Sequence, residues 1–140
     1  MKKLLTFLAV AIFLPVLAAD FPAGSPKFGT NYQEALATAK KEGKPVVLVF
    51  SAAWCPPCQA MKKTVYPSAE VKPLQDKFVW AYLDVDEEAN AKAAEQYKVQ
   101  GIPHVQFLDK EGKTLISQVG GVSAAEFAGI LTKVADKAGK

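Results

Sequence analysis

The stretch at residues 45–63, PVVLVFSAAWCPPCQAMKK, contains the signals that decide the fold. Its first part, 45–50, is a short apolar run rich in β-branched residues, which predicts a buried strand. The residues after Cys58 suit a helix, so the chain's only two cysteines, Cys55 and Cys58, lie at a strand-to-helix turn. Cys55 then occupies the helix N-terminus, where unpaired amides and the helix dipole favour a thiolate, the nucleophilic form of cysteine.

The prolines of this stretch agree with that geometry. Pro56 biases Cys55 towards the extended backbone of a helix N-cap, and prolines in a first helical turn give up no intrahelical hydrogen bond. However, neither Pro56 nor Pro57 has an N–H to donate to sulfur. We therefore expect the amides of Cys58 and Gln59 to be the nearest donors to the Cys55 sulfur.

The segment 50–58 resembles the active site of the thioredoxin superfamily. Two other segments carry the same resemblance: 99–103, VQGIP, is similar to the family's loop with a cis-proline, and 119–121, VGG, to its later glycine turn. The resemblance extends from Tyr32 to the C-terminus. It implies an α/β protein with a thioredoxin-like fold, in which a central mixed β-sheet carries helices on both faces. It also implies a cis peptide bond before Pro103.

The chemistry implied by the resemblance is disulfide exchange. Cys55 and Cys58 would form a redox-active disulfide, with Cys55 attacking a substrate disulfide and Cys58 resolving the mixed disulfide. We expect Cys55 to be the exposed thiol and Cys58 the shielded one. No cofactor is needed, because the electrons come from another thiol protein, either in the membrane or soluble. The substrate-binding residues would be Trp54, Pro56, Ile102 and Pro103.

The function that follows is that of an exported thiol:disulfide oxidoreductase acting on protein disulfides and dithiols, with reduction as the favoured direction. Three alternatives stay open. The first is a dedicated electron donor to one partner, such as an apocytochrome or a membrane redox carrier. The others are a metal carrier and a non-catalytic binding module.

A structural disulfide and a metal site are weaker interpretations of the cysteine pair. Closing so small a loop constrains the unfolded chain little, so a purely stabilising disulfide gains little. A metal site would have three ligands at most, namely Cys55, Cys58 and the only histidine, His104, and we expect no bound metal. His104 itself is expected to be a half-exposed strand residue, with thiolate tuning or substrate contact as the alternative.

Two positions depart from thioredoxin itself. Thioredoxin has a buried aspartate six residues before its first cysteine and a proline eight residues after it; here these positions hold Val49 and Lys63. The segment from Cys58 to Val71 is more similar to exported thioredoxin-like proteins, including the C-terminal domains of membrane electron carriers. The missing acid leaves the proton acceptor for Cys58 open, with water or a carboxylate from elsewhere in the chain as candidates.

The N-terminal residues 1–18 are typical of a secretory signal peptide, because Lys2 and Lys3 precede an apolar run that ends in small residues. Cleavage is expected after Ala18 or Ala19, which predicts a periplasmic or secreted protein. An uncleaved anchor is the alternative, although the apolar run is short for a membrane span. The net charge of +3, without arginine or a basic block, argues against nucleic-acid binding. We expect a monomer.

The remaining chain divides into an extended N-terminal arm at 19–30 and one thioredoxin-like domain at 31–140. Caps, turn residues and apolar periodicity predict its first half as a helix at 32–42, the strand at 45–50, a helix from 56 to Pro67, a short helical piece at 73–77 and a strand at 78–85. The second half is predicted as a helix from Asp86, as its cap, to Tyr97, strands at 105–108 and 114–119, and a last helix after the capping box of Ser123 and Glu126.

Overall fold

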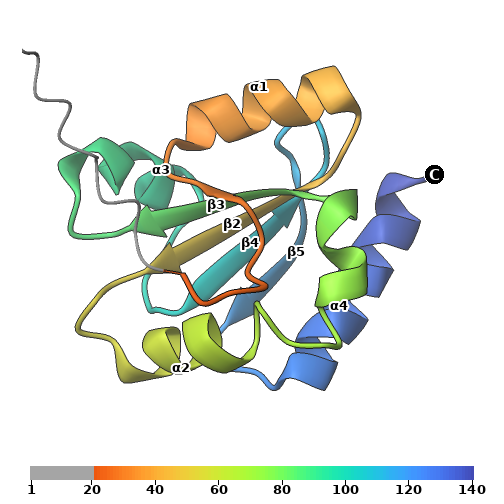
Figure 1. The fold of residues 1–140 in the computed structure, drawn as a ribbon. Coiled ribbons are helices and arrows are strands. Elements are labelled where there is room, and N and C mark those ends of the chain that lie inside the picture. Colours follow the sequence, from red (N-terminus) through yellow and green to blue (C-terminus); the bar gives the residue numbers. More distant parts are fainter. Residues whose placement is uncertain (1–20) are drawn as a thin grey trace, which may run out of the picture.

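The computed structural model describes residues 21–140, so the predicted signal peptide at 1–18 lies outside the described residues. Its centre is a five-stranded sheet with the strand order β1-β3-β2-β4-β5 (Figure 1). The strands are β1 (Phe28–Gly29), β2 (Val46–Ser51), β3 (Val79–Asp84), β4 (His104–Leu108) and β5 (Thr114–Val119). The helices are α1 (Tyr32–Glu42), α2 (Pro56–Thr64), α3 (Ala91–Gln96) and α4 (Ala124–Ala138), with 3-10 helices at Lys72–Lys77 and Glu88–Asn90. No helix in this described part is long and apolar enough to cross a membrane.

The connections between strands determine how the strands pair. A crossover through α2 lets β2 and β3 run parallel, whereas β4 pairs antiparallel with both β2 and β5. The β4–β5 hairpin is closed by Asp109, whose Oδ1 accepts hydrogen bonds from the amides of Glu111 and Lys113, both at 2.9 Å. The predicted mixed sheet is therefore confirmed.

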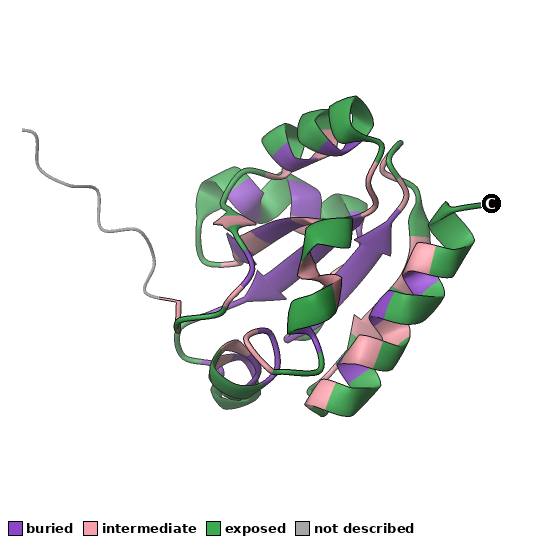
Figure 2. Cartoon of the chain, turned by 45° about the vertical axis from the view of Figure 1, so that its right-hand side comes forward, coloured by how far each residue is buried: buried purple, intermediate pink, exposed green. Residues whose placement is uncertain are grey.

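The central strand β2 is buried along its whole length. On one face, Val47 and Val49 pack into a core that includes Phe127 of α4 and Met61 of α2. On the other face, Phe50 belongs to a second core beneath α1 and α3, together with the remaining apolar residues of β2. Figure 2 shows the same layering, with buried strands between helices whose outer surfaces are exposed. Helices cover both faces of the sheet, as predicted.

The predicted helix caps form for α1 and α4. Asn31 Oδ1 accepts hydrogen bonds from the amides of Gln33 at 2.9 Å and Glu34 at 3.1 Å, and α1 ends at a left-handed glycine, Gly43. The side chain of Ser123 accepts from the amide of Glu126 while the Glu126 carboxylate accepts from the Ser123 amide, which completes the capping box.

The N-terminal arm is more ordered than the sequence predicts. Its residues Phe28 and Gly29 form β1, which pairs in parallel with Trp80 and Ala81 of β3. The ring of Phe21 lies 4.6 Å from that of Phe28, and Phe28 also stacks edge-on against Trp80. The arm is therefore part of the sheet, although its two strand residues are too few to show alternation in the sequence.

Two helix boundaries differ from the predicted ones by more than one residue, whereas the strand boundaries differ by one residue at most. The α2 helix ends at Thr64 rather than at Pro67, because the chain leaves the helix to bury Tyr66, which is 1% exposed. Asp86 does not cap a helix, so that prediction was wrong. Its amide donates to Asp84 Oδ1 at 2.9 Å, and α3 begins five residues later, at Ala91, after a 3-10 helix.

His104 is buried, with 5% of its surface exposed, so the expectation of a half-exposed residue was also wrong. Thr114 Oγ1 donates to Gln106 Oε1 at 2.9 Å, and the amide nitrogen of Gln106 then faces His104 Nε2 at 2.6 Å. In this arrangement Nε2 of His104 accepts, and its proton is carried by Nδ1, which has no partner. Burial lowers the pKa of His104 from its usual value of 6.5.

This buried imidazole predicts a stability that depends on pH. The unfolded chain takes up a proton at His104 near pH 6.5, whereas the folded chain resists it. The contribution is therefore fully present above about pH 6.5 and is lost as the pH falls towards the lower pKa of the folded state. We expect the free energy of unfolding, measured with denaturant, to decrease more between about pH 7 and pH 5 in the wild type than in His104→Gln.

Carboxylates contribute to the pH dependence of both proteins, so their contribution cancels in the difference between the wild type and His104→Gln. Parallel pH profiles of the two proteins would contradict the prediction.

Candidate active site

Cys55 and Cys58 form a disulfide where β2 passes into α2. Cys55 is the N-cap of α2, with the extended backbone that Pro56 favours, and Pro56 and Pro57 fill the first helical positions. Both cysteines are buried in this disulfide form, with exposed fractions of 3% for Cys55 and 1% for Cys58. The expected exposure of Cys55 is thus not seen, and the two cysteines differ in their position on the helix instead.

The Cys55 sulfur has few hydrogen-bond donors. The amide of Cys58 lies 3.4 Å from it, as predicted. The amide of Gln59, the second predicted donor, instead donates to the carbonyl oxygen of Cys55 at 3.1 Å. The nearest polar atom on the other side is the carbonyl oxygen of Ile102 at 3.8 Å, which is an acceptor. One weak amide contact and the helix dipole are therefore the favourable surroundings of a thiolate here.

The Ile102–Pro103 loop lies beside the disulfide, and its peptide bond is cis, as predicted. Ile102 packs with both cysteines and with the buried Ala52. The carbonyl of Pro103 accepts a hydrogen bond of 2.8 Å from the amide of Gly120, which ties this loop to the glycine turn after β5. The three segments that carry the sequence resemblance thus meet around one disulfide.

Trp54 is the most exposed large apolar side chain of the site, at 66%. Its Nε1 donates a hydrogen bond of 2.8 Å to Asp86 Oδ2, which fixes the indole over the end of β3. A groove of about 360 Å³ runs from Trp54 past Val85 and Val99 to Ile102. Sequence reasoning assigned Asp86 to a helix cap and missed this contact, because 32 residues separate Asp86 from Trp54.

Within residues 21–140, no carboxylate is buried beneath the disulfide. Val49 is fully buried between Tyr82 of β3 and Val105 of β4. In the described part of the chain, the buried polar residues are Ser51, Asn90, His104 and Gln106. On this side of the sheet, Ser51 Oγ and Tyr82 Oη share a hydrogen bond of 2.5 Å. Burial, more than any neighbouring charge, raises the pKa of Tyr82, which keeps the phenol neutral.

Two other ionisable side chains, His104 and Lys62, make contacts with groups other than the disulfide. His104 follows Pro103, but its ring packs against Phe50 and binds Gln106. The Lys62 ammonium of α2 lies 4.7 Å above the ring of Phe21. Among residues 21–140, no group of three His, Cys, Asp or Glu side chains is arranged to hold a metal ion.

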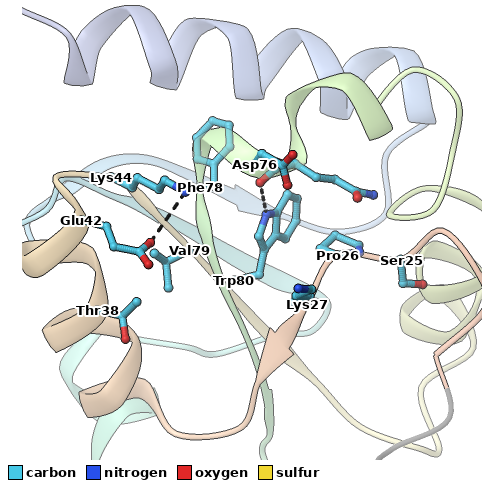
Figure 3. Close-up of a pocket in the computed structure, with 11 residues that line it drawn as sticks. Ser25, Pro26, Lys27, Thr38, Glu42, Lys44, Asp76, Phe78, Val79 and Trp80 are labelled. Carbon is cyan, nitrogen blue, oxygen red and sulfur yellow. Dashed lines mark hydrogen bonds and ion pairs between the residues drawn. The ribbon is translucent and has the colours of Figure 1, made fainter.

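A larger pocket than the groove beside Trp54 lies elsewhere. It measures about 490 Å³ and is lined by the N-terminal arm and by residues around the start of β3, among them Lys27, Asp76 and Trp80 (Figure 3). Lys44 and Glu42 form an ion pair of 3.6 Å at its rim. None of the predicted site residues lines this pocket, so size alone does not identify the site.

Comparison with known proteins agrees with this geometry. Residues 32–135 match the thioredoxin-like domain family. The thioredoxin-like protein HCF164 of Oryza sativa is 36% identical over 65% of this chain and 32% of its own length. The thiol:disulfide interchange protein DsbD of Colwellia psychrerythraea is 32% identical over 64% of this chain and 16% of its own length. The disulfide bond reductase DsbH of Chlamydia pneumoniae is 32% identical over 61% of this chain and 58% of its own length. The chain therefore spans less than two thirds of each of these relatives.

Solved structures give the same result. A thioredoxin from Thermus thermophilus superposes with a TM-score of 0.71 at 32% identity, covering 79% of this chain and 88% of that one. The oxidised C-terminal domain of DsbD from Neisseria meningitidis gives 0.65 at 27% identity, covering 76% of this chain and 97% of that one. The family match covers most of the chain, and the strands and helices are arranged as in the solved thioredoxin. The protein therefore belongs to the thioredoxin-like domain family.

Proposed function

We propose that the protein is a thiol:disulfide oxidoreductase that reduces disulfides in protein substrates through Cys55 and Cys58. The observation that carries this proposal is the disulfide at the N-terminus of α2, between the exposed Trp54 and the Ile102–Pro103 loop. Relatives named thiol:disulfide interchange protein and disulfide bond reductase support the same chemistry.

The reaction follows from the order of the two cysteines. The Cys55 thiolate attacks one sulfur of a substrate disulfide, and the other substrate sulfur leaves as a thiolate. Cys58 then loses its proton and attacks the Cys55 sulfur. The Cys55–Cys58 bond forms, the mixed disulfide breaks, and the substrate leaves with both sulfurs reduced. A second thiol protein supplies the electrons that reduce the pair again.

The surroundings of the Cys55–Cys58 disulfide favour a protein that reduces its substrates over one that oxidises them. A strongly oxidising disulfide requires a stabilised reduced form, above all a stabilised thiolate. Here Pro56 and Pro57 have no N–H to donate, and the Cys58 amide is 3.4 Å from the Cys55 sulfur. Little therefore stabilises a Cys55 thiolate, and the reduced protein should give up its electrons readily.

The substrate contacts proposed for this site are Trp54, Pro56, Ile102 and Pro103. Trp54 and Pro56 are exposed, and Ile102 lines the groove beside Trp54. An extended substrate segment placed in this groove would bring its sulfur to Cys55, because Ile102 packs directly against that residue.

Export is part of the proposal. The signal peptide at 1–18 would deliver the mature chain, an arm at 19–30 and a domain at 31–140, to the periplasm or the exterior as a monomer. A dedicated electron donor to one partner remains the second candidate. The similarity to DsbD favours this candidate, because the matching part is only 16% of that protein and is thus one module of a larger protein. Reduction of several unrelated protein disulfides at similar rates would argue against that narrower role.

The roles of the cysteines can be tested by trapping. Cys58→Ser should accumulate mixed disulfides with protein substrates, because Cys55 still attacks and nothing resolves the product. Cys55→Ser should accumulate few. The measurement is non-reducing electrophoresis of both variants after exposure to a disulfide-containing protein, with the double variant as the control. Equal trapping by Cys55→Ser would overturn the assignment.

The direction of electron flow can be tested at equilibrium with glutathione. We expect a reduction potential nearer that of thioredoxin, about −270 mV, than that of the strong oxidant DsbA, about −120 mV. The same titration on Pro56→Gly, which returns one amide to the first turn of α2, should give a less negative potential. A wild-type value near −120 mV would refute the reductase proposal while leaving the exchange chemistry intact.

Val49, at the position where thioredoxin itself has a buried aspartate, predicts a slow resolving step. With no carboxylate beneath the pair, Cys58 must lose its proton to water or to a distant group, so decay of the mixed disulfide should accelerate as the pH rises. Val49→Asp should speed this decay about tenfold or more near neutral pH and flatten its pH dependence, since a positioned general base contributes about 10²–10⁴. It should also lower the stability of the fold, because an unpaired acid in a buried strand loses its hydration.

The control for this experiment is Val49→Asn, because asparagine has nearly the shape of aspartate but does not accept a proton near neutral pH. The measurement is the single-turnover decay of a Cys55 mixed disulfide against pH in all three proteins. If a folded Val49→Asp protein decays at the wild-type rate at every pH, the missing acid does not limit this step.

A further inference from the structure

Gln59 connects α2 to the turn that carries the nucleophile. Its side-chain Nε2 donates a hydrogen bond of 3.0 Å to the carbonyl oxygen of Ala52, at the end of β2. Its backbone amide donates to the carbonyl oxygen of Cys55 at 3.1 Å. One residue of α2 therefore holds the carbonyls at both ends of the four-residue turn that contains Trp54.

The side-chain bond of Gln59 matters because few other hydrogen bonds hold the turn 52–55 to α2. Pro56 and Pro57 have no N–H, so the first two residues of α2 cannot donate to the turn. From the described part of the chain, the carbonyl of Ala52 otherwise accepts only the amide of Cys55, at a long 3.3 Å. Ala52 is 2% exposed and lies in one cluster with both cysteines, so without the Gln59 side chain this carbonyl would keep a single long hydrogen bond in a buried place.

The importance of the bond should depend on the redox state. In the oxidised protein, the Cys55–Cys58 disulfide ties the turn to α2 covalently. In the reduced protein and in the mixed disulfide, that covalent tie is absent. The hydrogen bonds that then hold the turn to α2 are the two of Gln59, from its amide to Cys55 O and from its side chain to Ala52 O, and the 3.4 Å contact from Cys58 N to Cys55 Sγ. Among these, the Gln59 side-chain bond is the one that reaches the start of the turn.

We propose that Gln59 is a positioning residue for disulfide exchange, which holds the turn 52–55 against α2 whenever the disulfide is open. This inference rests on the proposed function. During resolution, Cys58 forms its bond to the Cys55 sulfur while the bond from Cys55 to the substrate breaks and the substrate sulfur takes the electron pair. The step needs the two cysteine sulfurs close and aligned, so a turn that moves away from α2 slows it.

The inference is tested with Gln59→Met, which keeps the length and helix propensity of the side chain but removes its donor. Gln59→Lys restores a donor at similar reach, and Gln33→Met makes the same chemical change on the exposed surface of α1. Two quantities are measured in each protein: the single-turnover decay of a Cys55 mixed disulfide, and the equilibrium constant between the reduced and oxidised pair in glutathione buffers.

We expect Gln59→Met to slow resolution by about threefold to tenfold, the factor that corresponds to one net hydrogen bond. Its equilibrium should shift towards the oxidised form in the same range, because the open state loses more than the closed state. Gln59→Lys should recover most of both effects, and Gln33→Met should match the wild type.

Wild-type values of both quantities in Gln59→Met and in Gln59→Ala would overturn the inference. Equal impairment of Gln59→Lys and Gln59→Met would also overturn it, because the donor would then not be what matters. If neither Gln59→Met nor Gln59→Ala folds in the oxidised form, the bond is needed in both redox states and the proposed state dependence is wrong. A wild-type protein that exchanges no disulfide at all would instead refute the proposed function.

Discussion

The burial of β2 on both faces is the constraint on which the rest of the structure depends. All six residues from Val46 to Ser51 are buried, so the strand needs β3 and β4 at its sides and helices above and below. The burial continues into Ala52, which is 2% exposed. The point where the chain leaves the sheet is therefore set by the packed core, and Cys55 begins α2 at a position that core packing fixes.

The same constraint gives the disulfide two different surroundings. Towards the interior it meets Ala52 and Ile102, with Val49 deeper in the sheet, and none of these ionises. Towards solvent it meets the exposed Trp54 and Pro56. Charged groups take part in other contacts, as Lys62 does with the ring of Phe21. The main electrostatic influence on the two sulfurs is therefore the backbone of α2. The first turn of that helix offers fewer N–H donors than usual, because Pro56 and Pro57 have none.

Features that depend on neighbouring residues could be predicted from the sequence. Asn31, Gly43 and the pair Ser123–Glu126 are capping signals within one helical turn, and each formed as expected. The resemblance of three short segments to one family correctly predicted the fold and the cis peptide bond before Pro103.

Features that depend on contacts between distant segments could not be predicted. A histidine is expected from the sequence to be polar and half-exposed, but His104 is buried with its Nε2 bonded to Gln106. Thr114, on the other strand of the hairpin, donates to the Gln106 oxygen and so orients that amide. Asp86 resembles a helix cap until Trp54, 32 residues earlier, is brought beside it. The strand β1 depends on pairing with β3 and carries no local pattern of its own.

The pairing of β1 with β3 also bears on solubility. Without the arm, β3 would be the outer strand of the sheet and would offer unpaired backbone groups beside Trp80 and Ala81 to other chains. β1 covers that stretch, and Phe21 and Phe28 cover the ring of Tyr82 next to it. The arm, which carries no redox chemistry, therefore covers one of the two edges of the sheet, and a protein trimmed to residues 31–140 would expose the backbone of β3 to edge-to-edge pairing.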